Sequence, residues 1–220
     1  MEIFNALQKI RGLTEGEFNK KLSNHEKSKN LPKDRRRLLF EIIKGRKSVD
    51  YTCSVDIERY AIQCLLPEIP SSLLHEHHLY SRGDLYEYDP PKNGCNIIKH
   101  GISFGEVVSY SKRFGTLSVA CQNDKEERLV VFSDLNLDNG TYKLQLPLKG
   151  ARELNYILSI AEHRRSGSGF RLISSRIMSS KEKKYRETMK QSFKNIYSSE
   201  SDKDNFTNYC VEYIKKNLFY

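Results

Sequence analysis

Residues 86–106, YEYDPPKNGCNIIKHGISFGE, decide how the second half of the chain is interpreted. Two tyrosines flank Glu87, and this alternation of aromatic and charged residues is typical of a short, half-buried strand. Asp89 stands where a helix N-cap belongs, and Pro90 suits the first helical position because its missing N–H does no harm there. Gly101 fits the left-handed residue that ends many helices. The sequence therefore predicts a strand and then a helix from Pro90 to the residue before Gly101.

The same stretch predicts a second helix and a polar stripe on the first one. Ser103-x-x-Glu106 is a capping box, which indicates that a new helix begins almost at once. On the first helix, Lys92, Asn96 and Lys99 follow i, i+4, i+7 spacing. Side chains at this spacing share one face, so we expect the three to form one polar stripe.

The composition favours a charged protein of the cytoplasm. The chain has 220 residues, of which 38% are hydrophobic and 30% are charged. Its net charge of +9 favours an acidic partner such as nucleic acid, an acidic protein or an anionic membrane surface. The five cysteines are scattered without a C-x-x-C pair, which is typical of reduced thiols. No apolar run approaches the roughly 18 residues of a membrane span, and the N-terminus lacks the pattern of a signal peptide, so we expect no membrane association.

The first 84 residues predict a helical domain, to which the sequence assigns no role. Apolar residues recur there at helical spacing in about four short segments. Thr14-x-x-Glu17 is a capping box, and Pro32 lies in a polar stretch that interrupts the pattern. Residues 71–84 are expected to join this domain to the second half of the chain.

Two features of this half suggest a ligand. The run Arg35-Arg36-Arg37 is suited to phosphate, although a charge run beside a helix is more often a solvated face. The run at residues 75–78, HEHH, lacks the i, i+4 pair of a helical zinc site and has no evident fourth ligand. We therefore predict no metal and no cofactor.

The second half predicts further strands and a basic helix. Strands are expected at residues 116–120, 128–133, 154–161 and 170–175. An inserted strand or hairpin is expected within residues 134–150, where leucines alternate after the turn at Gly140. A capping box at Ser179 predicts a helix with a lysine-rich face, and a polar linker and short helix follow over residues 196–220.

The order of these residues resembles the BrnT toxins of bacterial type II toxin–antitoxin pairs. The resemblance begins with the pattern aromatic-Glu-aromatic-Asp-Pro-x-Lys-x-x-x-Asn-x-x-Lys-His-Gly-x-Ser-Phe in residues 86–104. It continues downstream at Glu127-Arg128, Glu162-His163-Arg164, the strand from Arg171 to Arg176, Glu182 and Tyr185. It covers about residues 85–194, and the insertion at 134–150 departs from the family pattern.

The resemblance implies an α+β fold for residues 85–195. The expected architecture is a RelE-like antiparallel sheet with two N-terminal helices and a C-terminal helix. The helical domain of residues 1–84 would precede it. Because of the insertion at 134–150, the order of strands in the sheet is left open.

The resemblance also implies a toxin that acts as a metal-independent endoribonuclease. In such cleavage the ribose 2′-hydroxyl attacks its own phosphate, which requires a base, an acid and cations for the developing charge. Lys99, Arg128, Arg171 and Arg176 are the candidates for binding the phosphate, because cations, and arginine forks above all, match phosphate oxygens. His100 is the first candidate for base or acid, and Tyr185 is a second candidate acid.

Structural considerations also apply to four of these candidates. His100, next to Gly101, suits the C-terminal end of a helix, where a cationic or donor side chain is favoured. Arg171 and Arg176 differ in parity along a strand, so a regular strand sends them to opposite faces unless a bulge or the strand end intervenes. Tyr185 lies on an apolar stripe, where packing is the more common role.

The resemblance implies partners as well as a substrate. RNA is the expected substrate, and a BrnA-type antitoxin protein is the expected partner, with DNA bound only through the antitoxin complex. A rival interpretation is a non-enzymatic module that binds nucleic acid or protein. In a third interpretation, residues 1–84 inhibit the basic site.

Overall fold

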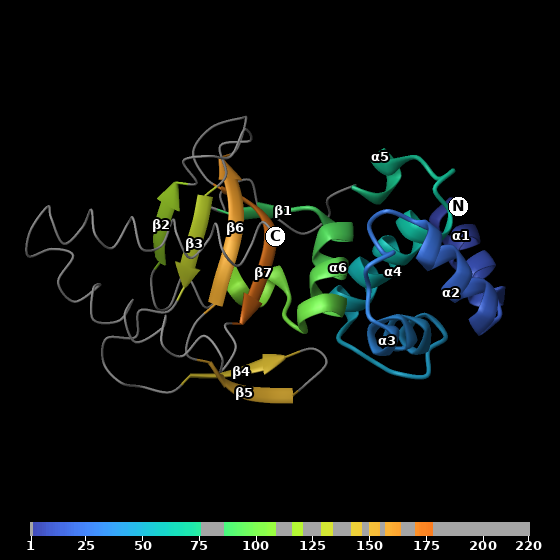
Figure 1. The fold of residues 1–220 in the computed structure, drawn as a ribbon, viewed down its shortest axis with the longest axis horizontal. Helices are drawn as coiled ribbons and strands as arrows, with labels where there is room; N and C mark the ends of the chain where they lie inside the picture. Colours follow the sequence, from blue (N-terminus) through green and yellow to red (C-terminus); the bar gives the residue numbers. More distant parts are fainter. Residues whose placement is uncertain are drawn as a thin grey trace, which may run out of the picture. The chain divides into compact units, whose positions relative to one another are not determined.

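The computed structural model describes residues 2–75, 86–108, 116–120, 129–133, 142–146, 150–154, 157–163 and 170–177. The helices are α1 Glu2–Gly12, α2 Glu15–Asn24, α3 Lys33–Ile43, α4 Tyr51–Leu65, α5 Ser71–Leu74 and α6 Pro90–His100. The strands are β1 Tyr86–Tyr88, β2 Thr116–Ala120, β3 Leu129–Ser133, β4 Tyr142–Leu146, β5 Gly150–Leu154, β6 Ile157–His163 and β7 Phe170–Ile177. Figure 1 labels them along the chain.

The chain divides into two compact units. Unit 1 is Met1–Phe104 with Gln145–Ala151, and unit 2 is Gly105–Leu144 with Arg152–Tyr220. The predicted division at residues 84/85 and 195/196 stays a prediction.

Helix α4 is the centre of unit 1. In the described part of the chain it contacts α1, α2, α3, α5 and α6, and its most extensive packing is against α6 (Figure 1). It has buried residues on every side, as expected of a helix surrounded by others. The largest fully buried side chains around it include Tyr60 of α4 itself, Phe18 of α2 and Leu39 of α3. Phe18 also meets Phe40 edge to face, with ring centroids 5.2 Å apart.

Local capping signals set the ends of the helices in unit 1. At α2, the side chain of Thr14 accepts a hydrogen bond from the backbone N–H of Glu17, and the Glu17 carboxylate accepts one from the backbone N–H of Thr14. This is the capping box that the sequence predicts. At α6, Gly101 has a φ of 77°, and its N–H donates to the carbonyl of Ile97, so the predicted helix end is also confirmed. The second predicted helix is present over residues 104–108, and the residues that follow lie outside the described part of the chain.

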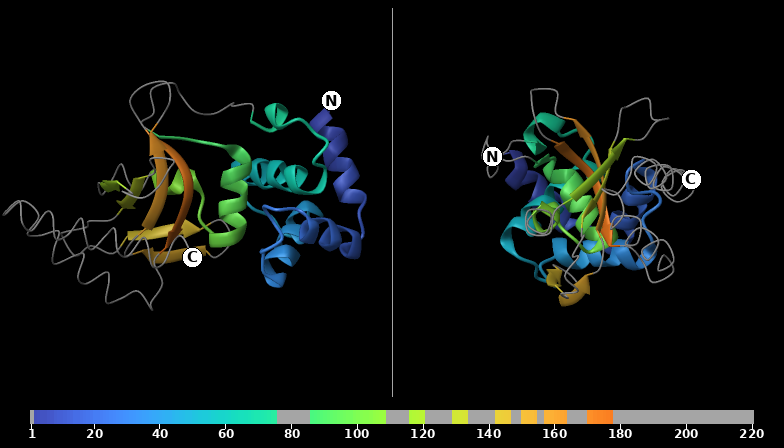
Figure 2. Two further views of the ribbon diagram at one scale, coloured as in Figure 1. Left: turned by 45° about the horizontal axis from the view of Figure 1, so that its top comes forward. Right: turned by 90° about the vertical axis from the view of Figure 1, so that its left-hand side faces the viewer.

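In unit 2, four strands lie side by side in the order β7-β6-β3-β2. All three pairs are antiparallel, and Thr116 of β2 pairs with Ser133 of β3, which pairs with Ile157 of β6. Figure 2 shows β6 and β7 as neighbours from two further directions. β4 and β5 form a separate two-stranded sheet.

The predicted fold class, a RelE-like antiparallel sheet with two N-terminal helices and a C-terminal helix, is wrong. The described regular structure is mostly helical, and β4 and β5 lie outside the larger sheet. The physical reason is that α6 packs against α4. Its buried face is matched to α4, and the two helices interlock at Gly94. The predicted C-terminal helix after Ser179 and the terminal helix within residues 196–220 lie outside the described residues.

Within the described residues, no helix combines the length and apolar character needed to cross a bilayer.

Replacing Gly94 by alanine should strongly destabilise unit 1. A Cβ at this position would lie 2.1 Å from the backbone carbonyl oxygen of Asp56 and 2.8 Å from the backbone nitrogen of Ile57. These atoms belong to the backbone of α4, which cannot rotate away, so we expect a loss of about 3 kcal/mol or more in the free energy of unfolding. Urea denaturation followed by circular dichroism measures the change.

Gly16→Ala is the matched control for this prediction. Gly16 also lies inside a helix, α2, but a Cβ at this position would have no atom from outside its own helix within 4 Å. Alanine there should raise the free energy of unfolding by up to about 1 kcal/mol. Equal stability losses for both variants would contradict a close approach that is specific to Gly94.

Candidate functional site

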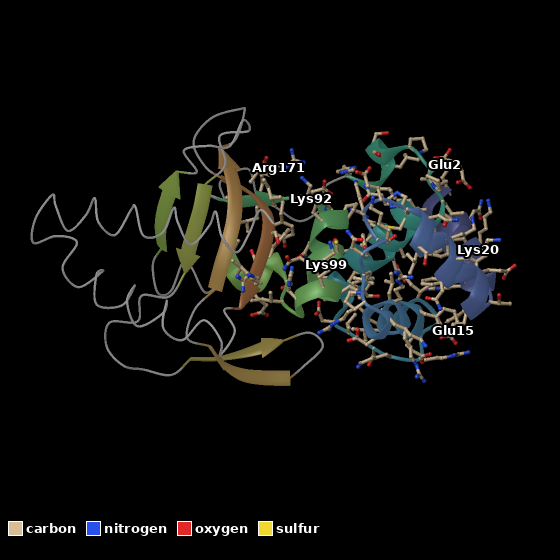
Figure 3. The ribbon with its side chains drawn as sticks, in the orientation of Figure 1. Glu2, Glu15, Lys20, Lys92, Lys99 and Arg171 are labelled. Atoms are coloured by element: carbon tan, nitrogen blue, oxygen red, sulfur yellow. The ribbon has the colours of Figure 1, made fainter. Side chains whose placement is uncertain are left out.

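Lys99 and His100 form the last turn of α6. Lys99 is exposed and His100 is partly exposed, and Figure 3 shows Lys92 and Lys99 on this helix. Both residues precede Gly101, where the helix ends and its dipole is negative. This position favours a cationic side chain, which is compatible with both the structural and the chemical interpretation of His100.

A buried asparagine fixes α6 on α4. The side-chain amide of Asn93 donates to the Asp56 carboxylate at 2.7 Å, and its oxygen accepts from the backbone N–H of Phe104 at 2.7 Å. Asn93 is 1% exposed, so both ends of a fully buried amide are satisfied. One side chain thereby links α4, α6 and the chain after α6. The sequence contains no direct signal for this role, because Asp56 is 37 residues away.

The predicted polar stripe on α6 is not one solvated face. Asn96 is 3% exposed, and its amide donates to the carbonyl of Ile102 at 2.9 Å. Lys92 is partly exposed, and Lys99 is exposed. The middle member of the stripe thus closes the turn after α6, and only its ends reach the surface.

Asp56 is a carboxylate for which the sequence carries no direct signal. Burial raises its pKa to about 6, against the opposing effects of the Asn93 hydrogen bond and the Arg59 charge. Arg59 is itself 8% exposed on the same helix, α4. Asp56 is therefore held in a site where its charged form is costly and only partly compensated.

His75 is bound at both of its ring nitrogens. Its Nε2 lies 2.8 Å from Oδ2 of Asp89, and its Nδ1 contacts the carbonyl oxygen of Ser71. The two contacts hold the ring between Ser71 at the start of α5 and Asp89 at the start of α6. Asp89 makes no side-chain hydrogen bond as the N-cap of α6, because its carboxylate faces His75 instead. The rest of the HEHH run lies outside the described residues.

The strand β7 brings Arg171 and Arg176 to one face. Ser175 pairs with Ser159 of β6, and Leu172 pairs with Ala161 of β6. Ser159 and Ala161 are two residues apart and share a face, whereas Ser175 and Leu172 are three apart. The register accommodates this difference by a bulge in β7, in which Ile173 is the extra residue.

The bulge reverses the parity on which the sequence prediction depends. Leu172 and Ser175 are each 1% exposed, as are Ser159 (1%) and Ala161 (0%), so these four define the buried face. Arg171 precedes Leu172 and Arg176 follows Ser175, so both arginines lie on the opposite face. Both are partly exposed, and Figure 3 labels Arg171. The sequence allows the two arginines to share a face only if a bulge or the strand end intervenes, and β7 contains such a bulge.

A buried serine pair lies beneath this face. Oγ of Ser159 and Oγ of Ser175 are 2.8 Å apart across β6 and β7. Each hydroxyl is thus satisfied in a buried position, and the contact holds the register on the C-terminal side of the bulge. Ser174 lies between the arginines on their face of the strand, because it pairs with Ile160.

Among the described residues, each of the two units holds two of the predicted site residues. Arg171 and Arg176 share a face in unit 2, and Lys99 and His100 are adjacent in unit 1. Arg128 and Tyr185 lie outside the described residues, as does the lysine-rich segment after Ser179.

The described residues form no metal-binding cluster, and two of the three described cysteines are buried. Among residues with described positions, no three His, Cys, Asp or Glu side chains gather in a group that could hold a metal ion. Cys53 and Cys64 are free and buried. Burial raises the pKa of the Cys64 thiol to about 11 and also raises that of Cys53, so neither suits a thiolate nucleophile.

No protein-family model, curated protein or solved structure matches this chain.

Asp56→Asn should flatten the pH dependence of stability. Because burial raises the pKa in the folded state to about 6, the unfolded chain loses this proton first, near pH 4. The free energy of unfolding should therefore fall as pH rises from about 4 to 6, by about 1.4 kcal/mol for each pKa unit. Asparagine can still accept the hydrogen bond from Asn93 without a charge. Denaturation at pH 4.5 and pH 7 should show the variant gaining stability over the wild type at the higher pH.

Asp34→Asn provides the comparison, because the Asp34 side chain is 76% exposed. It should leave the pH slope of the wild type unchanged. If the free energy of unfolding depended on pH equally in Asp56→Asn and Asp34→Asn, this would contradict the conclusion that burial makes the charged form of Asp56 costly.

Proposed function

We propose that this chain is the toxin of a type II toxin–antitoxin pair and acts as a metal-independent endoribonuclease. The observation that carries the proposal is the shared face of Arg171 and Arg176, which the bulge in β7 creates. Two guanidinium forks on one face suit a phosphate that gains negative charge during cleavage. The motifs that resemble the BrnT family supply the choice of RNA.

The proposed reaction needs only groups of the chain and the RNA itself. A base removes the proton of the ribose 2′-hydroxyl, and the resulting oxygen attacks the adjacent phosphorus. The bond from phosphorus to the 5′-oxygen breaks, and an acid protonates that oxygen. The products are a 2′,3′-cyclic phosphate and a free 5′-hydroxyl. The two arginines would stabilise the phosphorane by hydrogen bonds to its equatorial oxygens.

The remaining candidates keep distinct roles in the proposal. His100 is the proposed base or acid, because imidazole exchanges protons near neutral pH. Lys99 would contact the RNA backbone beside it, since its side chain is exposed. Arg128 is proposed as a further phosphate ligand and Tyr185 as a second acid.

The proposed partner is an acidic antitoxin of the BrnA type. A basic toxin with a net charge of +9 would attract such a protein, and binding over the arginine face would block access of RNA. DNA would be bound only by the complex, through the antitoxin.

Cleavage in the presence of a chelator tests the proposed reaction. The full chain should cut single-stranded RNA in EDTA and leave 2′,3′-cyclic or 3′-phosphate ends, detected by mass spectrometry. RNA with 2′-O-methyl groups should stay intact, because it lacks the nucleophile. Tight RNA binding without any cleavage would overturn the nuclease proposal and favour a non-enzymatic binding module.

Replacing Arg171 or Arg176 by lysine should slow this cleavage by about 100-fold each. Lysine keeps the positive charge but loses the planar fork, so it separates paired hydrogen bonding from simple attraction. If both arginines bind one phosphate, the cleavage rate of the double variant should fall by a smaller factor than the product of the two single-variant factors. Single-turnover rates on a defined oligonucleotide measure this coupling.

Arg11→Lys is the control for the arginine variants. Arg11 lies at the end of α1 and pairs with Glu58 at 2.8 Å, so its replacement should leave cleavage unchanged. Thermal unfolding of every variant checks that the chain stays folded. Wild-type rates in both Arg171→Lys and Arg176→Lys would remove the arginine face from the mechanism.

A further inference from the structure

The positive charge of the chain is concentrated in one short segment. Residues 20–47 contain eleven lysines and arginines and only three acidic residues, which gives a net charge of +8. The whole chain has a net charge of +9, so the other 192 residues together contribute only +1. The segment covers the end of α2, the loop to α3, α3 itself and the turn after it.

Some of these cations serve the fold. The guanidinium of Arg36 donates to the carbonyls of Leu31 and Lys29, each at 2.8 Å, and also to Oγ of Ser23. These bonds tie the start of α3 to the loop before it, so the loop has a defined course. Lys44 donates to the carbonyl of Leu13 at 2.7 Å and thereby fixes the end of α1.

Six further cations of the segment face solvent. We define the basic surface as the exposed side chains Lys20, Lys27, Lys29, Lys33, Arg37 and Lys47. In the described part of the chain, none of the six takes part in a salt bridge. Figure 3 shows Lys20 on α2, where it projects outward. The backbone that carries Lys29 is held by Arg36, so this part of the surface is ordered before any ligand arrives.

The position of several cations is unfavourable for the dipole of α3. Lys33, Arg35 and Arg36 occupy the first turn of α3, where the helix dipole is positive and acidic residues are preferred. Asp34 is the acidic residue of this turn. The arrangement therefore carries an electrostatic cost that a bound polyanion would relieve.

The chemistry of the segment favours a phosphate backbone over a protein or membrane partner. Among the described residues, the exposed large hydrophobic side chains are Phe4 and Tyr51, and neither lies in residues 20–47. Protein interfaces are anchored by buried aromatic and apolar side chains, and membrane-inserting surfaces need apolar side chains as well. A surface of separate lysines and one arginine instead fits a chain of phosphates, which it binds by releasing counterions.

We infer that the basic surface binds the phosphate backbone of single-stranded RNA. The choice of RNA among nucleic acids rests on the proposed function, whereas binding to phosphates rests on the charge and exposure of the surface alone. Its contacts are independent of base sequence, because lysine ammonium groups on phosphates carry no sequence information. The surface is separate from Arg171 and Arg176 in the chain and would hold RNA without cutting it.

The test uses the full chain and a fluorescent single-stranded RNA with 2′-O-methyl groups, so that binding is measured without cleavage. The variant Lys27→Gln/Lys29→Gln/Lys33→Gln removes three charges. Anisotropy titrations at several salt concentrations should show about 10-fold or greater loss of affinity. The slope of log affinity against log salt should fall by about 2, since each phosphate contact on a single strand contributes about 0.7.

Two controls separate local binding from overall charge and folding. Lys27→Arg/Lys29→Arg/Lys33→Arg keeps the charges and should bind as the wild type does. Lys9→Gln removes one exposed lysine from α1, outside the segment, and should weaken binding less than Lys33→Gln does. Thermal unfolding of the triple glutamine variant should match the wild type, because none of its three side chains is buried.

The outcomes distinguish this inference from the proposed function. If the triple glutamine variant kept the RNA affinity and the salt dependence of the wild type, the inference that the basic surface binds RNA would be overturned, even if the chain cleaves natural RNA. Loss of binding in that variant, together with intact natural RNA, would support the surface and overturn the nuclease. Tighter binding to poly-glutamate or to duplex DNA than to the RNA would overturn RNA as the occupant.

Discussion

The close approach of α6 to α4 at Gly94 is the constraint on which unit 1 depends. The Cα of Gly94 faces the peptide group between Asp56 and Ile57, and any side chain there would meet backbone atoms. This proximity allows Asn93 to span the gap and bind both the Asp56 carboxylate and the Phe104 amide. The last turn of α6, with Lys99 and His100, is positioned as a consequence.

The same approach explains why a costly carboxylate sits inside the unit. Asp56 is buried against α6, which can approach α4 closely because Gly94 has no side chain. The neutral amide of Asn93 donates a hydrogen bond to the Asp56 carboxylate and so offsets part of the cost of its burial. Removing the donor would leave a buried charge without this bond, which is far more costly than the bond is favourable. The network therefore contributes less to net stability than to the choice of a single arrangement of the two helices, because another crossing would leave these polar groups unsatisfied.

Local signals were readable from the sequence, and long-range pairings were not. Pro90 and Gly101 act within one turn of their own positions, so they predicted both ends of α6. Gly94 carried a weaker signal, since glycine inside a helix is unfavourable and often marks close packing. Its partner Asp56 is distant in sequence, so no spacing rule connects the two. For the same reason the sequence did not show that α6 packs on α4, and the predicted fold class failed at this point.

The same contrast between local signals and long-range pairings applies to the candidate site. Residue types and order singled out Arg171 and Arg176, but their parity argued against a shared face. The bulge depends on which residues of β6 and β7 pair, and neither Ile173 nor its neighbours carry the glycine that often marks one. Asn93 and Asp56 were missed because polar residues on a helix are normally expected at the surface. Burial of Asn96 on the predicted polar stripe is a second case of this kind.

The extra residue in β7 also has a consequence for how this strand tolerates change. In a regular strand, the face of a side chain follows from its distance to any neighbour, so both faces are fixed by alternation alone. Here Ile173 divides β7 into two segments of opposite phase, and the common face of the arginines depends on the number of residues between them. Substitutions at Ile173 that keep the backbone course would preserve that face. Loss of one residue would instead turn one arginine towards Ser159 and Ala161, so the length of this segment is under tighter constraint than its composition.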